Sequence, residues 1–270
     1  MHVRWVTALM AIVILAIAGC KKVISVSLAG ADSKYVIEGK LDNTSGCSVL
    51  LSTTEDINTV SGFQGVDSAV VTLTVAGDSL IYLKRIKKGS YYTSYTGEPG
   101  KTYSLQVVIN GNVFTASSTM PQQVNMNSLY VSNRNIAGKK KYVPVVTYSD
   151  PAAIANYYNF VQVVNRKSAG LVFIQEDHLT NGNDVSLPLL LTGTTITDSY
   201  LTEIDKGDSL QVEMQCIDAN VYRYWYSLKT GASGEGLMAT PANPVSNITG
   251  GALGYFSAHT SQVKKMKVED

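Results

Sequence analysis

The residues best suited to acid–base or metal chemistry are histidines, and the chain has three of them. His2 belongs to the N-terminal leader treated below, which leaves His178 and His259. His178 follows Glu176 and Asp177, and on a strand only Glu176 and His178 would share a face, because adjacent side chains point to opposite sides. That pair could bind a metal or act as acid and base, or the triplet could be a solvated loop. His259 has no acidic residue close to it in the sequence.

Nucleophilic catalysis needs an activated serine or cysteine, and no motif that provides one is present. The run Gly231-Ala232-Ser233-Gly234 falls short of the Gly-x-Ser-x-Gly turn that exposes a nucleophilic serine. Phosphate-binding, dinucleotide-binding and calcium-binding loops are missing, as is any metal-ligand spacing of cysteines. We therefore predict a protein that is not an enzyme, with no catalytic residue, metal or cofactor. An envelope hydrolase is the alternative, and it would need His178 or His259 beside an acid and a serine.

Two cysteines, Cys47 and Cys216, lie in the body of the chain. Each falls in phase with apolar neighbours in an alternating run, which predicts that both point into cores as small hydrophobic side chains. A disulfide between them is the alternative in an oxidising compartment, and it would have to join the two halves of the chain.

Aromatic side chains gather at residues 157–160 and 222–226. In a helix, Tyr222 and Tyr226 lie on one side with Trp225 beside them. With Tyr157 and Tyr158 they make a candidate stacking platform for a sugar or a peptide. The alternative is that the helix uses its rings to pack against a sheet.

The start of the chain has the organisation of a lipoprotein signal peptide, residues 1–19. Arg4 supplies a positive end, and no charge occurs from Trp5 to Gly19, a stretch shorter than the roughly 20 residues of a membrane span. Cys20 follows the small residue Gly19 directly. We expect cleavage between Gly19 and Cys20, with lipid on the Cys20 thiol holding the protein to a membrane.

The residues after Cys20 bear on sorting within the envelope. Lys21 and Lys22 stand where an aspartate would favour retention at the inner membrane, so we expect delivery to the outer membrane. Acidic residues just after the cysteine would favour surface display, and none occurs before Asp32, which leaves the periplasmic or outer face open. Residues 20–34 are predicted to be a lipidated tether.

The charge balance argues against nucleic acid as a partner. The leader holds Arg4 and no acidic residue, so the 22 basic residues of the chain fall to 21 and equal the 21 acidic ones. The short basic runs at 139–141 and 264–265 are typical of solvated turns or tails.

The first half of the mature chain reads as antiparallel β structure. Short segments of alternating polarity are separated by turn signals, among them Asn110-Gly111. The predicted strands are 35–41, 47–53, 69–75, 79–83, 89–93, 102–109 and 113–118. Their number and spacing predict an immunoglobulin-like or transthyretin-like β-sandwich over residues 35–121, with a boundary at Pro121.

Residues 122–270 are predicted to form a second β-rich domain with one amphipathic helix. The helix is expected from Asp218 to Lys229, because Asp218 or Asn220 can cap it, its apolar positions share a face and Gly231 can end it. The predicted strands are 128–132, 142–148, 157–164, 171–175, 187–191, 209–217 and 253–260.

Five short motifs occur in order along the mature chain: Tyr35-Val36-Ile37-Glu38-Gly39, Asp150-Pro151 followed by Asn156-Tyr157-Tyr158, Tyr222-Arg223-Tyr224-Trp225, Asn243-Pro244-Val245-Ser246-Asn247-Ile248, and the run from Gly250 to Ala258. In these motifs the chain resembles a Bacteroidota envelope lipoprotein family known only as a domain of unknown function (family number 4249). The resemblance implies an envelope lipoprotein often encoded beside a TonB-dependent receptor. It supplies no catalytic residue.

Together these features predict a non-enzymatic outer-membrane lipoprotein that acts as an accessory or binding subunit of a TonB-dependent receptor, in uptake or assembly. A glycan- or peptide-binding surface lipoprotein is the main alternative, and the envelope hydrolase is the third.

Overall fold

The computed structural model describes residues 33–56, 62–75, 79–136, 138–152, 154–168, 170–190, 204–233 and 243–269. Residues Ser33–Asp270 form one compact unit. The predicted signal peptide, Cys20 and most of the predicted tether lie outside the described residues. No helix of the described part is both long and apolar enough to cross a bilayer.

The protein is mainly β, as the sequence predicts. Its strands are β1 (Tyr35–Asp42), β2 (Cys47–Thr53), β3 (Ala69–Val75), β4 (Ser79–Tyr82), β5 (Lys84–Lys87), β6 (Ser90–Thr93), β7 (Thr102–Ile109), β8 (Asn112–Thr119), β9 (Met126–Ile136), β10 (Lys139–Ser149), β11 (Tyr157–Val164), β12 (Lys167–Ser168), β13 (Phe173–Glu176), β14 (Asp184–Pro188), β15 (Ser209–Ile217) and β16 (Leu253–Lys267). The helices of the described residues are the 3-10 turn η1 (Asp177–Leu179) and α2 (Ala219–Ser233).

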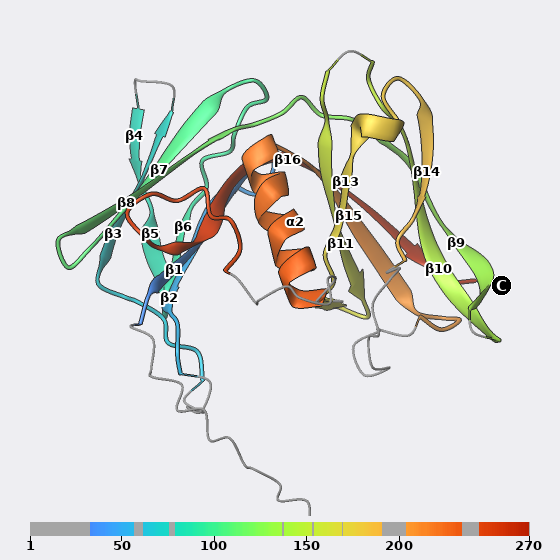
Figure 1. Ribbon diagram of the computed structural model, residues 1–270, viewed down its shortest axis with the longest axis horizontal. Helices are drawn as coiled ribbons and strands as arrows, with labels where there is room; N and C mark the ends of the chain where they lie inside the picture. Colours follow the sequence, from blue (N-terminus) through green and yellow to red (C-terminus); the bar gives the residue numbers. More distant parts are fainter. Residues whose placement is uncertain are drawn as a thin grey trace, which may run out of the picture. The chain divides into compact units, whose positions relative to one another are not determined.

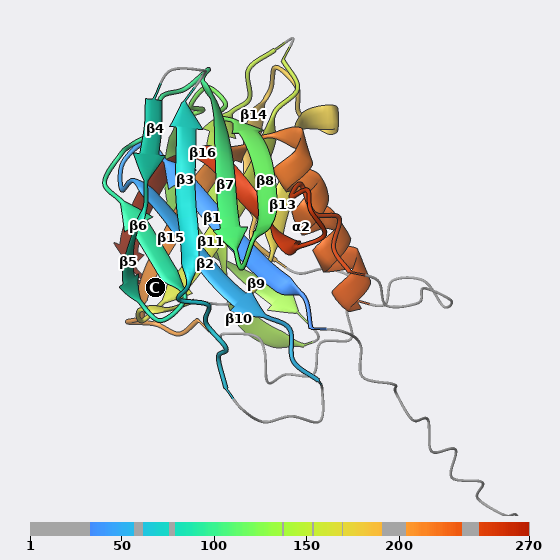
Figure 2. The same cartoon turned by 90° about the vertical axis from the view of Figure 1, so that its left-hand side faces the viewer.

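Three sheets account for these strands. The largest has nine strands in the order β12-β11-β15-β16-β1-β2-β6-β5, with β13 also pairing on β11. A four-stranded sheet, β4-β3-β7-β8, and a three-stranded sheet, β14-β10-β9, complete the β structure. Figure 2 shows the four-stranded sheet in front, with β1 and β2 behind it.

Each small sheet packs on the large sheet around its own hydrophobic core, which makes two β-sandwiches. The first core joins β1, β2 and part of β16 to the four-stranded sheet through side chains such as Ile37, Leu51 and Leu105. The second core joins β11 and β15 to β10 through side chains such as Phe160 and Tyr148. Successive side chains of a strand point to opposite faces, so the alternating residues of β1 and β7 place one face in the core and the other outside it.

The last strand, β16, belongs to both sandwiches. Its first half pairs in parallel with β1, where Leu41 lies opposite Ala258, and its second half pairs antiparallel with β15, where Cys216 lies opposite Thr260. Ala258 and Thr260 are two residues apart and so share a face, which means that one continuous face of the large sheet lines both cores. In Figure 1 β16 (red) runs from the first sandwich into the second.

Residues 248–258 therefore lie with the first core, although the sequence pattern predicts them within a domain of residues 122–270. Ile248, Ala252, Phe256 and Ala258 are all buried there. A boundary drawn in sequence at Pro121 cannot show this return, because the pairing of β16 with β1 links residues at opposite ends of the chain.

Helix α2 covers part of the opposite face of the large sheet. Val221 and Tyr224 of the helix pack with Ile217 and Tyr255, which point away from the two main cores. The helix continues through Gly231, where the sequence analysis ended it. A single glycine costs a helix only about 1 kcal/mol, so it does not by itself stop one.

Candidate functional site

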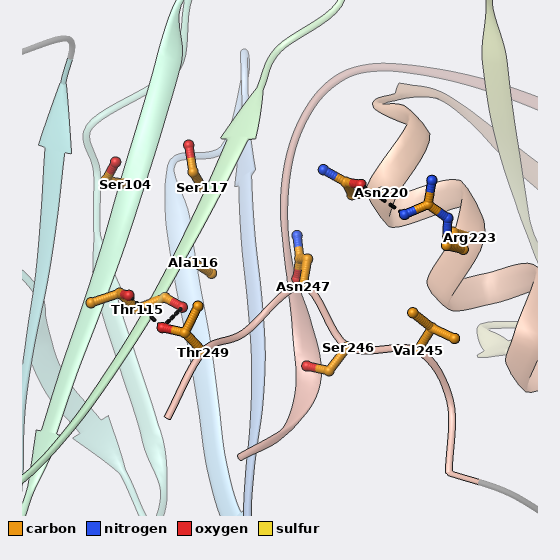
Figure 3. A pocket seen from close by; sticks show the side chains of 10 residues that line it. All are labelled: Ser104, Thr115, Ala116, Ser117, Asn220, Arg223, Val245, Ser246, Asn247 and Thr249. Carbon is orange, nitrogen blue, oxygen red and sulfur yellow. Dashed lines mark hydrogen bonds between the residues drawn. The ribbon is translucent and has the colours of Figure 1, made fainter. Parts of the chain in front are cut away.

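One concave region of the described residues is an open cavity of about 530 Å³, called here the polar groove (Figure 3). It lies between the four-stranded sheet, the start of α2 and the segment that precedes β16. Its lining residues are Ser104, Thr115, Ala116, Ser117, Asn220, Arg223, Val245, Ser246, Asn247 and Thr249.

The sheet side of the groove comes from the outer positions of β7 and β8, where Ser104 lies opposite Ser117. The edge of β8 is only partly paired: Ala116 forms an isolated bridge with Ile248. Beside it, the Thr249 backbone N–H donates to the carbonyl oxygen of Thr115 over 2.8 Å. These bonds fix the segment before β16 as the floor of the groove.

The helix side of the groove is fixed by the capping of α2. One carboxylate oxygen of Asp218 accepts the backbone N–H groups of Asn220 and Val221, both at 2.9 Å. The other accepts the hydroxyl of Ser118 on β8, and the Ser118 oxygen in turn accepts the backbone N–H of Ala258 over 2.9 Å. One carboxylate thus holds the helix N-terminus against β8 and β16.

The described lining of the groove offers hydrogen-bonding groups. Its polar lining consists of hydroxyl and amide groups and one guanidinium, Arg223, whose Nη1 donates to Oδ1 of Asn220 over 3.3 Å. Figure 3 shows Asn220 and Arg223 facing Ser117 across the opening. Such groups recognise a polar ligand through hydrogen bonds, and none of the described lining residues is an acid or base near neutral pH.

A second concave region, the His259 crevice, lies on the α2 side of the large sheet and has a volume of about 210 Å³. It gathers residues of β1, β11, β15, β16 and α2 with the segment at 168–172. Its lining residues are Lys40, Asn159, Val161, Ser168, Gly170, Leu171, Val172, Gln215, Trp225, Tyr255, Ser257 and His259.

His259 is buried in this crevice beside a serine. Its Nδ1 lies 3.0 Å from the Ser257 hydroxyl oxygen. Burial lowers the pKa of His259, and this outweighs the opposite effect of the Glu213 and Asp42 carboxylates; Lys40 adds to the lowering. The imidazole is therefore favoured in its neutral form.

The backbone N–H groups on both sides of Ser257 already have acceptors. An oxyanion hole requires backbone N–H groups free to bind the developing negative charge. The N–H of Phe256 donates to Asn247 over 2.9 Å and that of Ala258 donates to Ser118, so the groups on both sides of Ser257 are occupied. Ser257 thus lies beside His259, with both flanking N–H groups engaged elsewhere.

His178 lies elsewhere, exposed on η1. Asp177 is buried and accepts the backbone N–H of Asn156 over 2.9 Å, which is a structural role. Glu176 is exposed at the end of β13. Among the described residues no group of three or more potential ligands is placed to hold a metal.

The five aromatic residues of the predicted platform do not form one surface. The prediction that Tyr158 belongs to this platform is wrong. Tyr158 is fully buried in the second core, and its ring centre lies 4.8 Å from that of Tyr148. Its neighbour Tyr157 points to the opposite face of β11, because adjacent strand residues alternate between faces. Tyr157, Tyr222 and Tyr226 stack in a column, with ring centres 5.0 and 6.0 Å apart.

Trp225 points instead to the His259 crevice, with its ring 5.0 Å from that of Tyr255. The helix thus uses part of its aromatic set for packing and leaves Tyr226 on the surface, 53% exposed. Burial, with a smaller contribution from Glu176, raises the pKa of the Tyr222 hydroxyl to about 12.

Cys47 and Cys216 are free thiols, buried as their alternating sequence context predicts. They belong to the first and the second core respectively. Burial, reinforced by the Asp42 carboxylate, raises the pKa of the Cys47 thiol to about 12, and burial raises that of Cys216. Both are therefore poor nucleophiles in the folded protein.

Sequence reasoning missed the polar groove. Ser104 and Ser117 are outward-facing strand residues like many others, and only the pairing of β7 with β8 places them together. The sequence motif around Asn247 was noticed, but nothing in it indicated that Asn247 would bind the backbone of Phe256.

Fold and site define a mainly β protein of two sandwiches that share one sheet and carry an open groove lined by polar side chains. The chain belongs to the family described as domain of unknown function (DUF4249), whose sequence profile matches residues 22–265. No curated protein matches the chain. Among solved structures, a two fibronectin type-III domain segment from chicken tenascin is 12% identical, covers 68% of this chain and 91% of its own, and has a TM-score of 0.23.

Proposed function

We propose that this protein is a lipid-anchored, non-catalytic binding subunit of a Bacteroidota-type outer membrane, working with a TonB-dependent receptor in uptake or assembly. The leader ending at Gly19 and the cysteine that follows it support the lipid anchor. The family match begins at residue 22, directly after that cysteine and Lys21, as expected if the leader is a separate signal.

The observation that carries the proposal is the polar groove. Its volume is about 530 Å³, its lining donates and accepts hydrogen bonds, and Arg223 is the only ionised side chain among its described lining residues. The partly paired edge of β8 runs alongside it, and an extended segment of a partner can add to such an edge by main-chain hydrogen bonds. We therefore assign the groove to the receptor contact.

Affinity purification of tagged protein from detergent-solubilised membranes tests this assignment. We expect the wild-type chain to recover a TonB-dependent receptor in near-equal amount. Arg223→Glu should lose most of that receptor, because it reverses the charge of an exposed side chain at the groove without touching a core.

Arg134→Glu is the matched control, since Arg134 is exposed on β9 and does not line the groove. Recovery of lipoprotein alone from the wild type would contradict the receptor partnership. Equal recovery by Arg223→Glu and wild type would contradict the assignment of the groove.

The second candidate function, glycan or peptide binding at the surface, is favoured by the Tyr157–Tyr222–Tyr226 column. Stacked rings with one exposed member suit a sugar face or an aromatic side chain. Tyr226→Ala should abolish retardation in gels containing bacterial polysaccharide while leaving the thermal midpoint unchanged. Unchanged retardation, or no retardation of the wild type, would dismiss this function.

A further inference from the structure

The His259 crevice has the composition of a small-ligand site, and neither the polar groove nor the lipid anchor accounts for it. We propose that it binds a single hydroxylated ring of monosaccharide size, neutral or carrying one carboxylate. Four polar side chains that line it, Asn159, Gln215, Ser257 and His259, are each more than 90% buried. Buried polar groups need hydrogen-bond partners, and the crevice pairs these four side chains with one another and with Glu213.

The amides of the crevice floor are held in fixed orientations. Nδ2 of Asn159 donates to Oε1 of Gln215 over 2.7 Å, and Nε2 of Gln215 donates to the Glu213 carboxylate over 2.9 Å. Ser261 also donates to that carboxylate oxygen, over 2.7 Å. Because a carboxylate accepts only, this chain of bonds sets which atom of each amide is N and which is O.

That arrangement is preorganised for a ligand with several hydroxyl groups. These hydrogen bonds use one N–H of Asn159 and one N–H of Gln215. Each side-chain amide has further donor and acceptor positions. Nδ1 of His259 is already paired with Ser257, so the neutral imidazole offers Nε2 as one further donor or acceptor, depending on its tautomer. Sugar hydroxyls both donate and accept, so they match such a mixed floor.

An aromatic wall stands beside the polar floor. Trp225 is half-buried and lies against Tyr255, which is itself buried. The apolar C–H face of a sugar ring packs on an indole face while its hydroxyls point to amides, which is the usual division in small-molecule sites between apolar walls and a few placed polar groups.

Size and charge narrow the ligand class. The crevice is smaller than the roughly 300–1,000 Å³ of sites for drug-sized molecules, which favours a single ring. Its described lining holds no carboxylate, so the ammonium of an amino acid or a peptide would find no ionic partner. Lys40 is exposed at the rim and can meet one carboxylate, as in a uronic acid.

The tryptophans of the chain provide a direct readout. The sequence holds two, Trp5 and Trp225, so the chain from residue 20 onward has Trp225 as its only tryptophan. Residues 20–270 with Cys20→Ser should be titrated with glucose, galactose, N-acetylglucosamine and glucuronate, with alanyl-alanine as the non-sugar probe. We expect a saturable change in Trp225 fluorescence with at least one sugar, at a Kd of roughly 1 mM or below.

Two serine variants locate the binding. Ser168→Phe fills the crevice from an exposed position on β12 and should weaken binding at least ~10-fold, about 1.4 kcal/mol. Ser104→Phe is the matched control, an exposed strand serine that lines the polar groove and not the crevice; it should bind as wild type. Circular dichroism should show unchanged folding of both.

Should Ser168→Phe not fold, Lys40→Ala replaces it. This exposed rim variant should weaken glucuronate relative to glucose if the ligand is acidic, and binding of a neutral sugar should stay within about 3-fold. Saturation-transfer NMR of the same sugars checks binding without the tryptophan.

Several outcomes overturn the proposal. One is no saturable response to any sugar by fluorescence or NMR. Another is binding that survives in Ser168→Phe, and a third is a preference for alanyl-alanine over all four sugars. Loss of receptor recovery in Arg223→Glu bears only on the groove, so failure of one assignment leaves the other intact.

Discussion

At the scale of single residues, His259 shows how burial decides what a side chain can do. The imidazole sits beside a serine, with carboxylates near enough to act on its charge, yet desolvation prevails and favours the neutral ring. The same burial that weakens it as a base makes it sensitive to acid. Protonation would place a charge where the fold offers few water contacts.

The first prediction concerns pH. Because the pKa of His259 is lower in the folded protein than the ordinary value of 6.5, the unfolded chain takes up the proton first as the pH falls. The free energy of unfolding should therefore decline below about pH 6.5, with a limit for one group of about 1.4 kcal/mol per pH unit. Urea denaturation from pH 7.5 to 5 measures it.

His259→Gln is the comparison, since an amide can keep the bond to Ser257 without titrating. Its stability should decline less steeply over the same range. Identical slopes for the two proteins would show that His259 does not titrate on unfolding.

The second prediction concerns the Asp218 cap. Asp218→Ala removes the acceptor for two backbone N–H groups and for the Ser118 hydroxyl, so the free energy of unfolding should fall by about 1–2 kcal/mol. Asp218→Asn keeps a capping oxygen and should lose less. Arg223→Ala, exposed on the same helix, should stay within about 0.5 kcal/mol of wild type. A loss no greater than that of Arg223→Ala would mean that the cap contributes little.

At the scale of elements, the parallel pairing of β1 with β16 connects the two sandwiches, because β16 also pairs with β15. It requires close approach at one position. Gly254 has φ +99° and lies opposite Ile37, and a Cβ there would sit 2.0 Å from the Ile37 carbonyl oxygen. Any other residue must push the two strands apart.

The third prediction tests this pairing. Gly254→Ala should cost at least ~4 kcal/mol, because it combines a backbone clash with an unfavourable φ. Gly251 has φ +88° and open space around it, so Gly251→Ala should cost only the conformational strain, about 1–2 kcal/mol. Chemical denaturation of both variants compares them. Equal losses would show that the contact with Ile37 relaxes at no cost.

The alternation of apolar and polar residues predicts most of the strands. It does not predict which strands pair with each other. The strands at 47–53 and 209–217 have the predicted bounds, because apolar and polar residues alternate along most of each. The strand at 157–164 also has the predicted bounds, although its apolar residues occupy both faces. β5 was missed, since all four of its residues are exposed and an edge strand needs only backbone pairing. The groove and the crevice depend on which strands pair, which a periodic pattern does not encode.

At the scale of the whole molecule, two cores share one sheet. The face of that sheet which lines the first core through Leu41 continues into the second through Cys216, with β16 between them. If β16 separates from one sandwich, the strand that it leaves there, β1 or β15, has an unpaired edge. We therefore expect the two sandwiches to unfold together.

The fourth prediction uses the two buried thiols as reporters of the two cores. In Cys20→Ser background, variants that keep only Cys47 or only Cys216 should react with a thiol reagent at the same fraction of unfolding as Trp225 fluorescence reports. Reaction of Cys216 well before Cys47 would show that the second sandwich opens alone. The fluorescence midpoint of each variant corrects for any change in stability caused by the second substitution.

The union of residues 36–42 with residues 253–259 also sets an order of events when the chain is made. A ribosome releases the first strand long before its parallel neighbour exists, so β1 must wait with one edge open while about four-fifths of the polypeptide is still being synthesised, at roughly 5–20 residues per second. A protein truncated shortly before residue 253 would lack β16. It would therefore leave β1, near the start of the chain, with one edge unpaired, just as it would β15.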